Sequence, residues 1–191
     1  MDPFTACYLG GARLRGYAQR PALGTRGGIL LLWDENVINI TDVQATEFYL
    51  SAMVTSVHTD ASFKITTVYG TTLASRKDDF FDELLMSKPP MGTMWLVLGD
   101  FNQIFRARDK NTTNINRRRM NKFKATLDNC DLKHIHLQNW RFTWSNEQAN
   151  PTMSRIDGAF CNPECDLSSG HHILHALSSL LSDHCPPLAP R

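Results

Sequence analysis

Short apolar runs separated by turn residues predict a series of β-strands in the first third of this chain. The run at 29–33 follows a glycine-rich turn, and a second strand can start at 37–40. Residues 47–57 are rich in β-branched and aromatic side chains, and residues 63–69 repeat this composition. With the run at 37–40, these segments are predicted to be neighbouring antiparallel strands. No clean strand is predicted before residue 24.

Helical spacing replaces the strand pattern in two later segments. In the first, apolar residues recur three and four positions apart between Phe80 and Leu85, and Pro89-Pro90 ends the pattern. In the second, the apolar stripe consists of Met120, Phe123, Leu127 and Cys130. The first helix separates the strand series from the segment that follows.

That segment, residues 94–98, consists of five consecutive apolar residues and ends abruptly at Gly99-Asp100-Phe101-Asn102. A strand with this pattern is buried on both faces, and it delivers two polar side chains at its end. Chemistry tends to sit at such strand ends in layered α/β proteins. The alternative is that Gly99, Asp100 and Asn102 are ordinary turn formers.

The remaining pattern predicts a hairpin from residues 139–145 and 153–160, followed by an apolar segment at 173–181. No internal repeat, low-complexity tract or linker interrupts the chain. A single domain over residues 1–191, with two strand-rich halves, is therefore expected.

Composition narrows the function classes. The chain of 191 residues is 42% hydrophobic and carries a formal net charge of +1, so any attraction to nucleic acid must be local. Five scattered cysteines and no secretion signal indicate reduced thiols inside the cell. No apolar run approaches the ~18 residues needed to span a bilayer, so a soluble protein with no membrane partner is expected.

One predicted helix face is locally basic. The start and outer face of the second helix carry Arg117, Arg118, Arg119, Lys122 and Lys124. Such a run is commonly a solvated helix face, and the alternative is a patch that contacts phosphates. Positive charge at the start of a helix opposes the helix dipole, which mildly favours a partner.

Three polar clusters end or interrupt the predicted strands: Asp100 with Asn102, Arg155 with Asp157, and Asp183 with His184. Together they supply a carboxylate able to activate water, an amide donor and a histidine able to meet an anionic oxygen. A further carboxylate could hold that histidine in one tautomer.

These residues resemble the endonuclease/exonuclease/phosphatase superfamily, and more closely the endonuclease domain of plant-type LINE (non-LTR) retrotransposons. The resemblance covers nearly the whole chain in eight ordered blocks. The blocks are Leu9-Gly10-Gly11, Thr25-Arg26-Gly27-Gly28-Ile29-Leu30-Leu31-Leu32-Trp33, Val68-Tyr69-Gly70, Gly99-Asp100-Phe101-Asn102, Asn116-Arg117-Arg118, Phe142-Thr143-Trp144-Ser145, Arg155-Ile156-Asp157 and Leu181-Ser182-Asp183-His184-Cys185-Pro186.

The resemblance implies an α/β (α+β) fold, a four-layer sandwich of two mixed β-sheets flanked by helices. It also implies hydrolysis of a DNA phosphodiester with Mg²⁺, or Mn²⁺ in its place. An all-oxygen site suits magnesium, because a divalent cation with fixed donors stabilises the charge that gathers on phosphate oxygens.

The implied roles of the site residues follow the family motifs. Asp100 would orient and deprotonate the attacking water, and Asn102 would steady the transition state. His184 would bind a non-bridging phosphate oxygen, with Asp157 orienting its imidazole. Asp183 would act at the metal, and Tyr69 would contact the phosphate. The expected DNA contacts are Arg117, Arg118, Arg119, Lys122 and Arg155.

One departure from the family pattern changes the expected activity. Family members carry a principal metal-ligand glutamate just before a segment that resembles Asp2-Pro3-Phe4, where this chain has Met1. The chain is therefore expected to lack the first strands and helix of the family fold and to bind metal weakly. Nuclease activity is expected to be weak or lost. Exposed sheet edges would favour self-association, and no obligate protein partner is evident.

Three other functions stay open at this point. The chain could be a catalytically inactive nucleic-acid-binding module, which would bind DNA in a salt-dependent way without cleaving it. It could be a non-functional retroelement remnant, which would fail to fold cooperatively. Phosphatase or lipid-diesterase chemistry on the same fold is a weaker alternative, because fold does not fix function. A nuclear location is inferred from the implied substrate alone.

Overall fold

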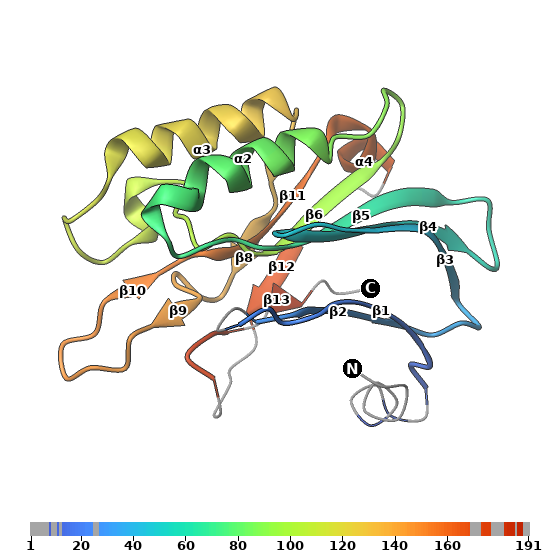
Figure 1. Cartoon of the computed structure of the whole chain (residues 1–191), viewed down its shortest axis with the longest axis horizontal. Helices are drawn as coiled ribbons and strands as arrows, with labels where there is room; N and C mark the ends of the chain where they lie inside the picture. The colour runs from blue at the N-terminus through green and yellow to red at the C-terminus, as the bar shows by residue number, and fades with distance from the viewer. Residues whose placement is uncertain are drawn as a thin grey trace.

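A six-stranded mixed sheet forms the centre of the protein in the computed structural model (Figure 1). The structure describes residues 8, 11, 13–24, 27–168, 173–176, 182–185 and 187–188. The sheet has the order β3-β4-β5-β6-β11-β7, in which β5 and β6 are parallel and the other neighbours are antiparallel. Its strands are β3 (Ile38–Ala45), β4 (Tyr49–Ser56), β5 (Ser62–Tyr69), β6 (Trp95–Asp100), β7 (Lys133–His134) and β11 (Asp157–Cys161).

The predicted central strand is β6, and its two faces enter two different cores. Trp95 and Val97 are fully buried among the aromatic residues beneath the helices. Leu96 and Leu98 pack in a second cluster on the opposite face. This confirms the prediction, made from the uninterrupted apolar run, that the strand is covered on both sides.

Helices α2 (Lys77–Met86) and α3 (Arg117–Asn129) cover one face of the large sheet (Figure 1). Their apolar stripes meet a cluster of buried phenylalanines that also receives side chains from β11 and from the loop after β6. Ring centroids in this cluster lie 5.1 to 6.4 Å apart, and its members are Phe80, Phe81, Phe101, Phe123 and Phe160. Shorter helical segments are η1 (Ala74–Arg76), η2 (Ala107–Asp109) and α4 (Pro163–Ser168).

Smaller sheets pack against the other face (Figure 1). The β1-β2 hairpin is antiparallel, and the β8-β12-β13 sheet is mixed. A separate two-stranded ribbon consists of β9 and β10. These strands are β1 (Gly16–Arg20), β2 (Ile29–Trp33), β8 (His136–Gln138), β9 (Trp144–Ser145), β10 (Met153–Ser154), β12 (Ile173–Ala176) and β13 (Pro187–Leu188). The predicted α/β sandwich with two mixed sheets is therefore confirmed.

Two predictions about strands are wrong. Residues 16–20 form β1, although no clean strand was expected before residue 24. The strand begins at Gly16, which packs directly against the Trp33 ring, because a Cβ at this position would lie 2.2 Å from that ring. The pattern of residues in this short segment does not reveal this contact. The hairpin strand expected at 139–145 is reduced to Trp144–Ser145, because Arg141 and its neighbours form a loop.

The β3 edge of the large sheet is interrupted. A bulge lies between Thr41 and Gln44, and Asp42 within it adopts a left-handed conformation with φ of 49°. Bulges and charges on edge strands oppose edge-to-edge pairing. This feature of β3 acts against self-association, which stays a prediction.

Within the described residues, no helix combines the length and hydrophobicity needed to cross a membrane.

We expect Thr66→Val to destabilise the protein by about 1–3 kcal/mol. The indole Nε1 of Trp95 donates to Oγ1 of Thr66 at 2.9 Å, and both residues are fully buried, so the variant leaves a buried donor unsatisfied. Urea denaturation measures the change in the free energy of unfolding. Thr67→Val, on the other face of the same strand, is the matched control, and an equal effect in both variants would contradict this account.

Candidate active site

Three of the predicted site residues are aligned across neighbouring strands. Tyr69 on β5 pairs with Asp100 on β6, and Asp100 pairs with Asp157 on β11. Paired residues on adjacent strands point to the same face of a sheet, so the register brings these side chains together at one end of three interior strands. The buried strand β6 therefore fixes where its terminal carboxylate emerges.

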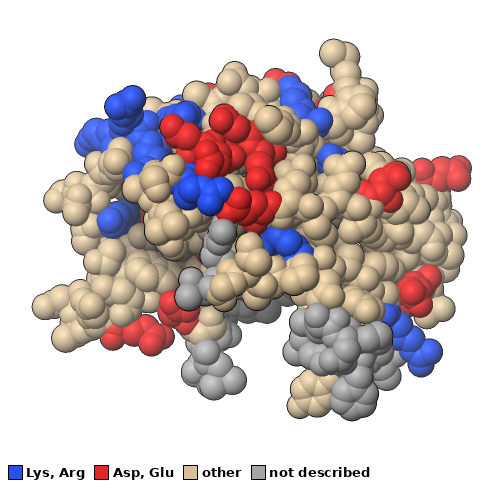
Figure 2. Space-filling model, viewed as in Figure 1, with Lys and Arg blue, Asp and Glu red and all other residues tan. Residues whose placement is uncertain are grey.

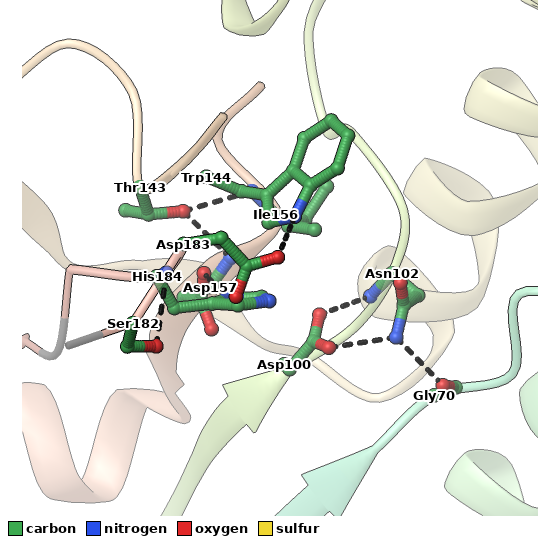
Figure 3. Close-up of polar contacts among 10 residues, drawn as sticks. All are labelled: Gly70, Asp100, Asn102, Thr143, Trp144, Ile156, Asp157, Ser182, Asp183 and His184. Atoms are coloured by element: carbon green, nitrogen blue, oxygen red, sulfur yellow. Dashed lines mark hydrogen bonds and ion pairs between the residues drawn. The ribbon is translucent and has the colours of Figure 1, made fainter. Parts of the chain in front are cut away.

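The turn after β6 is held by its own polar side chains (Figure 3). The backbone N–H of Asn102 donates to Oδ1 of Asp100 at 2.7 Å, and Nδ2 of Asn102 donates to Oδ2 at 2.7 Å. Nδ2 also donates to the carbonyl of Gly70 at 2.9 Å. Asn102 has φ of 48°, a conformation that asparagine tolerates better than most residues.

Asp157 and His184 form the second part of the site. Nδ1 of His184 lies 2.8 Å from Oδ2 of Asp157 and hydrogen-bonds to it. The backbone of Asp157 is fixed in turn by buried Thr143, whose Oγ1 accepts the N–H groups of Ile156 and Asp157 at 3.1 and 3.0 Å. The carboxylate thus selects the ring nitrogen of His184 that carries the proton and leaves Nε2 for another partner.

Strand β9 anchors the segment that carries His184. The N–H of Ser145 donates to the carbonyl of Asp183 at 3.1 Å, and the N–H of Cys185 donates to the carbonyl of Thr143 at 2.7 Å. The Trp144 indole N–H donates to Oδ2 of Asp183 at 2.9 Å (Figure 3). The carboxylate of Asp183 is therefore engaged by Trp144, and the role of Asp183 at a metal stays a prediction.

Among the described residues, Asp100, Asp157 and His184 form a cluster whose candidate ligand atoms all lie within 4.8 Å of one another. Two carboxylates and an imidazole are a donor set that divalent cations accept, with carboxylate oxygens preferred by Mg²⁺. The cluster thus fits a divalent cation.

The electrostatics of the cluster point the same way. Burial, and then the nearby charge of Asp157, raise the pKa of Asp100 to about 6. The hydrogen bond that His184 donates to Asp157 raises the pKa of His184 above its ordinary value, and the charges of Asp100 and Asp183 add to this effect. The carboxylates of Asp100 and Asp157 repel each other at the ends of neighbouring strands, and this repulsion favours a bound cation.

Three of the predicted basic residues gather at the start of α3. Arg118, Arg119 and Lys122 line a hollow of about 330 Å³, with Asp78 as its acidic member. Lysine and arginine side chains cover the start of α3, next to acidic side chains of α2 (Figure 2). Nζ of Lys122 pairs with Asp78 at 2.8 Å, and Arg117 is the exposed first residue of the helix.

Arg155 is placed differently. Its Nε and Nη2 donate to the backbone carbonyls of Arg141 and Trp140 at 2.9 and 3.1 Å. These contacts tie down the loop before β9, and a DNA contact by Arg155 stays a prediction.

Neither Thr143 nor Trp144 was among the predicted site residues, although both stand in a block of the family resemblance. Each acts through a partner that is far away in sequence, Asp157 in one case and Asp183 in the other. The block itself was the only available signal.

The chain belongs to the endonuclease/exonuclease/phosphatase family, whose sequence profile matches residues 3–184. The resemblance to this superfamily noted from the motifs is therefore confirmed, whereas the closer resemblance to plant-type LINE endonucleases stays a prediction. No curated protein matches this sequence.

Solved structures share the fold. The endonuclease domain of TRAS1, a telomere-specific non-LTR retrotransposon, is 14% identical with a TM-score of 0.68, over 90% of this chain and 76% of that domain. TDP2 from D. rerio, solved with a single-strand DNA product, is 15% identical with a TM-score of 0.61, over 99% of this chain and 82% of that one. A family protein from Bacteroides thetaiotaomicron is 14% identical with a TM-score of 0.59, over 91% and 74%. At these identities the similarity shows the fold alone.

We expect Asp100→Asn to gain stability relative to the wild type as the pH rises. The pKa of Asp100 is raised from 3.8 to about 6 in the folded protein, so ionising the folded carboxyl costs free energy that the unfolded chain does not spend. This cost is absent below about pH 4 and complete above about pH 7. The difference in unfolding free energy, variant minus wild type, should increase by roughly 1–3 kcal/mol across that window.

Urea denaturation in the presence of a metal chelator measures this difference. The matched control is Asp60→Asn, which removes a carboxylate from an exposed bend outside the cluster. A difference that stays flat or decreases for Asp100→Asn would contradict the proposed repulsion.

Proposed function

We propose that this chain is a divalent-metal-dependent DNA endonuclease of low activity. The observation that carries the proposal is the convergence of Asp100, Asp157 and His184 in one cluster at the ends of β6 and β11. Family membership supports phosphoester hydrolysis as the reaction class. The titles of two fold relatives name a retrotransposon endonuclease and a complex with a DNA product, which supports DNA as the substrate.

The chain's own residues have distinct roles in this proposal. Asp100, with its pKa raised to about 6, is ionised at neutral pH and accepts a proton from the attacking water. The raised pKa of His184 favours the imidazolium, in which both ring nitrogens are donors. Nδ1 then donates to Asp157, and Nε2 donates to a non-bridging phosphate oxygen. Asn102 steadies the transition state, and Tyr69, beside Asp100 in the sheet, contacts the phosphate.

The carboxylates of Asp100 and Asp157 would hold Mg²⁺ or Mn²⁺, with Asp183 as a further proposed ligand. When bound, such a cation stabilises negative charge on phosphate oxygens. Low activity is proposed because no glutamate belongs to the cluster among the described residues. Glu47 pairs with Arg76, and Glu83 accepts from Thr46, so these two carboxylates are engaged elsewhere.

The basic residues at the start of α3 are proposed to follow the DNA backbone. Arg118 and Arg119 line the hollow at the start of α3, and neither has an acidic partner among the described ion pairs. Contacts of this kind to phosphates are independent of base sequence. A nuclear location follows only if the substrate is chromosomal DNA.

We expect the purified chain to nick supercoiled plasmid slowly, and only with Mg²⁺ or Mn²⁺. Asp100→Ala and His184→Ala should each lower the nicking rate by about 100-fold or more, because each removes a group that acts on the reacting atoms. Asp131→Ala, at the far end of α3, is the matched control and should nick like the wild type.

Cleavage that survives in both variants, or without metal, would contradict the proposed site. The second candidate function is a non-catalytic module, which the basic hollow favours. A folded protein that binds DNA but never cuts it would identify that function.

We expect Arg118→Ala and Arg119→Ala each to weaken DNA binding and to reduce the slope of log affinity against log salt concentration by about 1. Fluorescence anisotropy with a labelled duplex over a salt series measures this slope. Lys133→Ala is the control, because Lys133 is exposed but lies at the opposite end of β11 from Asp157. Unchanged slopes for both arginine variants would rule out this patch as the DNA-binding surface.

A further inference from the structure

Lys77 is a buried cation in an unfavourable position. It is the first residue of α2 and only 3% exposed. Removing an ammonium group from water costs free energy, and the positive end of the helix dipole adds to that cost. A lysine in this position therefore points to a role for its charge or for its hydrogen bonds.

The partner of Lys77 lies in the candidate active site. Nζ donates to the backbone carbonyl of Asn102 at 2.5 Å. Asn102 closes the turn that presents Asp100, and its left-handed conformation leaves the turn dependent on the bonds around it. The hydrogen bonds of the Asn102 side chain stay within the turn and Gly70, whereas Lys77 joins the main chain of the turn to the helical layer.

We propose that Lys77 is a positioning residue, which fixes the turn at 100–102 through the Asn102 carbonyl and places a positive charge behind Asp100. The catalytic part of this inference rests on the proposed nuclease function, and the structural part does not. Lys77 is too deeply buried to reach DNA, so its effect passes through the turn and not through a phosphate contact.

The same helix offers a matched comparison. Nζ of Lys64 donates to the backbone carbonyl of Ser87 at 2.8 Å, at the C-terminal end of α2. Lys64 is half-buried, and it lies at the end of the sheet away from Asp100. Lys64→Met therefore removes the same type of bond from the same helix without touching the turn.

The test compares Lys77→Met, Lys77→Arg and Lys64→Met in the full chain. The first readout is the backbone amide resonance of Asn102 in ¹⁵N-labelled protein, without metal or DNA. The second is plasmid nicking, with kcat and KM for DNA measured separately. Thermal unfolding of each variant shows that the comparison is between folded proteins.

We expect Lys77→Met to shift the Asn102 resonance and to lower kcat by about 10- to 100-fold with KM unchanged. Lys77→Arg keeps a charged donor, so its shift of the Asn102 resonance and its loss of kcat should both be smaller. Lys64→Met should alter neither the Asn102 resonance nor kcat. If Lys77→Met does not fold, Lys77→Gln, which keeps a donor without the charge, takes its place.

An unmoved Asn102 resonance in folded Lys77→Met would overturn the inference. If the wild type cuts DNA, an unchanged kcat in Lys77→Met would also overturn it. A raised KM with unchanged kcat would also overturn it, because that result describes a substrate contact. If the wild type does not cut DNA, the proposed function fails, and the Asn102 resonance alone decides whether Lys77 positions the turn.

Discussion

The arrangement of this protein depends on the pairing of one buried strand with neighbours on both sides. Strand β6 is covered by the phenylalanine cluster on one face and by an aliphatic cluster on the other, so it cannot shift its register without exposing apolar side chains. Its pairing with β5 and β11 places Tyr69, Asp100 and Asp157 side by side. The candidate site is thus a consequence of how the core packs.

That placement brings two carboxylates together in a partly buried position, which costs stability. Burial and the charge of Asp157 raise the pKa of Asp100, while the N–H of Asn102 and the charges of His184 and Lys77 act in the opposite direction. The surrounding residues therefore limit the repulsion without removing it. Such a site favours the binding of a cation, and with the cation an anionic substrate. A fold can thus lose some stability where it forms an active site.

Much of this could be predicted from the sequence, because the strongest signals are local. The apolar run before Asp100 predicted β6, and the helical spacing of Phe80 and Leu84 predicted α2. Asp157 and His184 were found in polar clusters that end or interrupt predicted strands, and the family motifs assigned their roles. The structure places Nδ1 of His184 2.8 Å from Oδ2 of Asp157. Lys77 was not found, because its role depends on a carbonyl 25 residues away that no pattern reveals. Strand β1 was missed because its glycine is explained only by the Trp33 ring that covers it.

The central claim, which stays a proposal, is that the carboxylates of Asp100 and Asp157, with His184 beside them, form one site that holds a divalent cation. Paramagnetic broadening by Mn²⁺, added below one equivalent to ¹⁵N-labelled protein, tests this claim directly. The account predicts that the amide of Asn102 and the ring of His184 broaden first, and that Asp100→Asn abolishes this effect. Broadening that begins elsewhere, for example at the exposed acidic residues of α2, or that persists in Asp100→Asn, would contradict it.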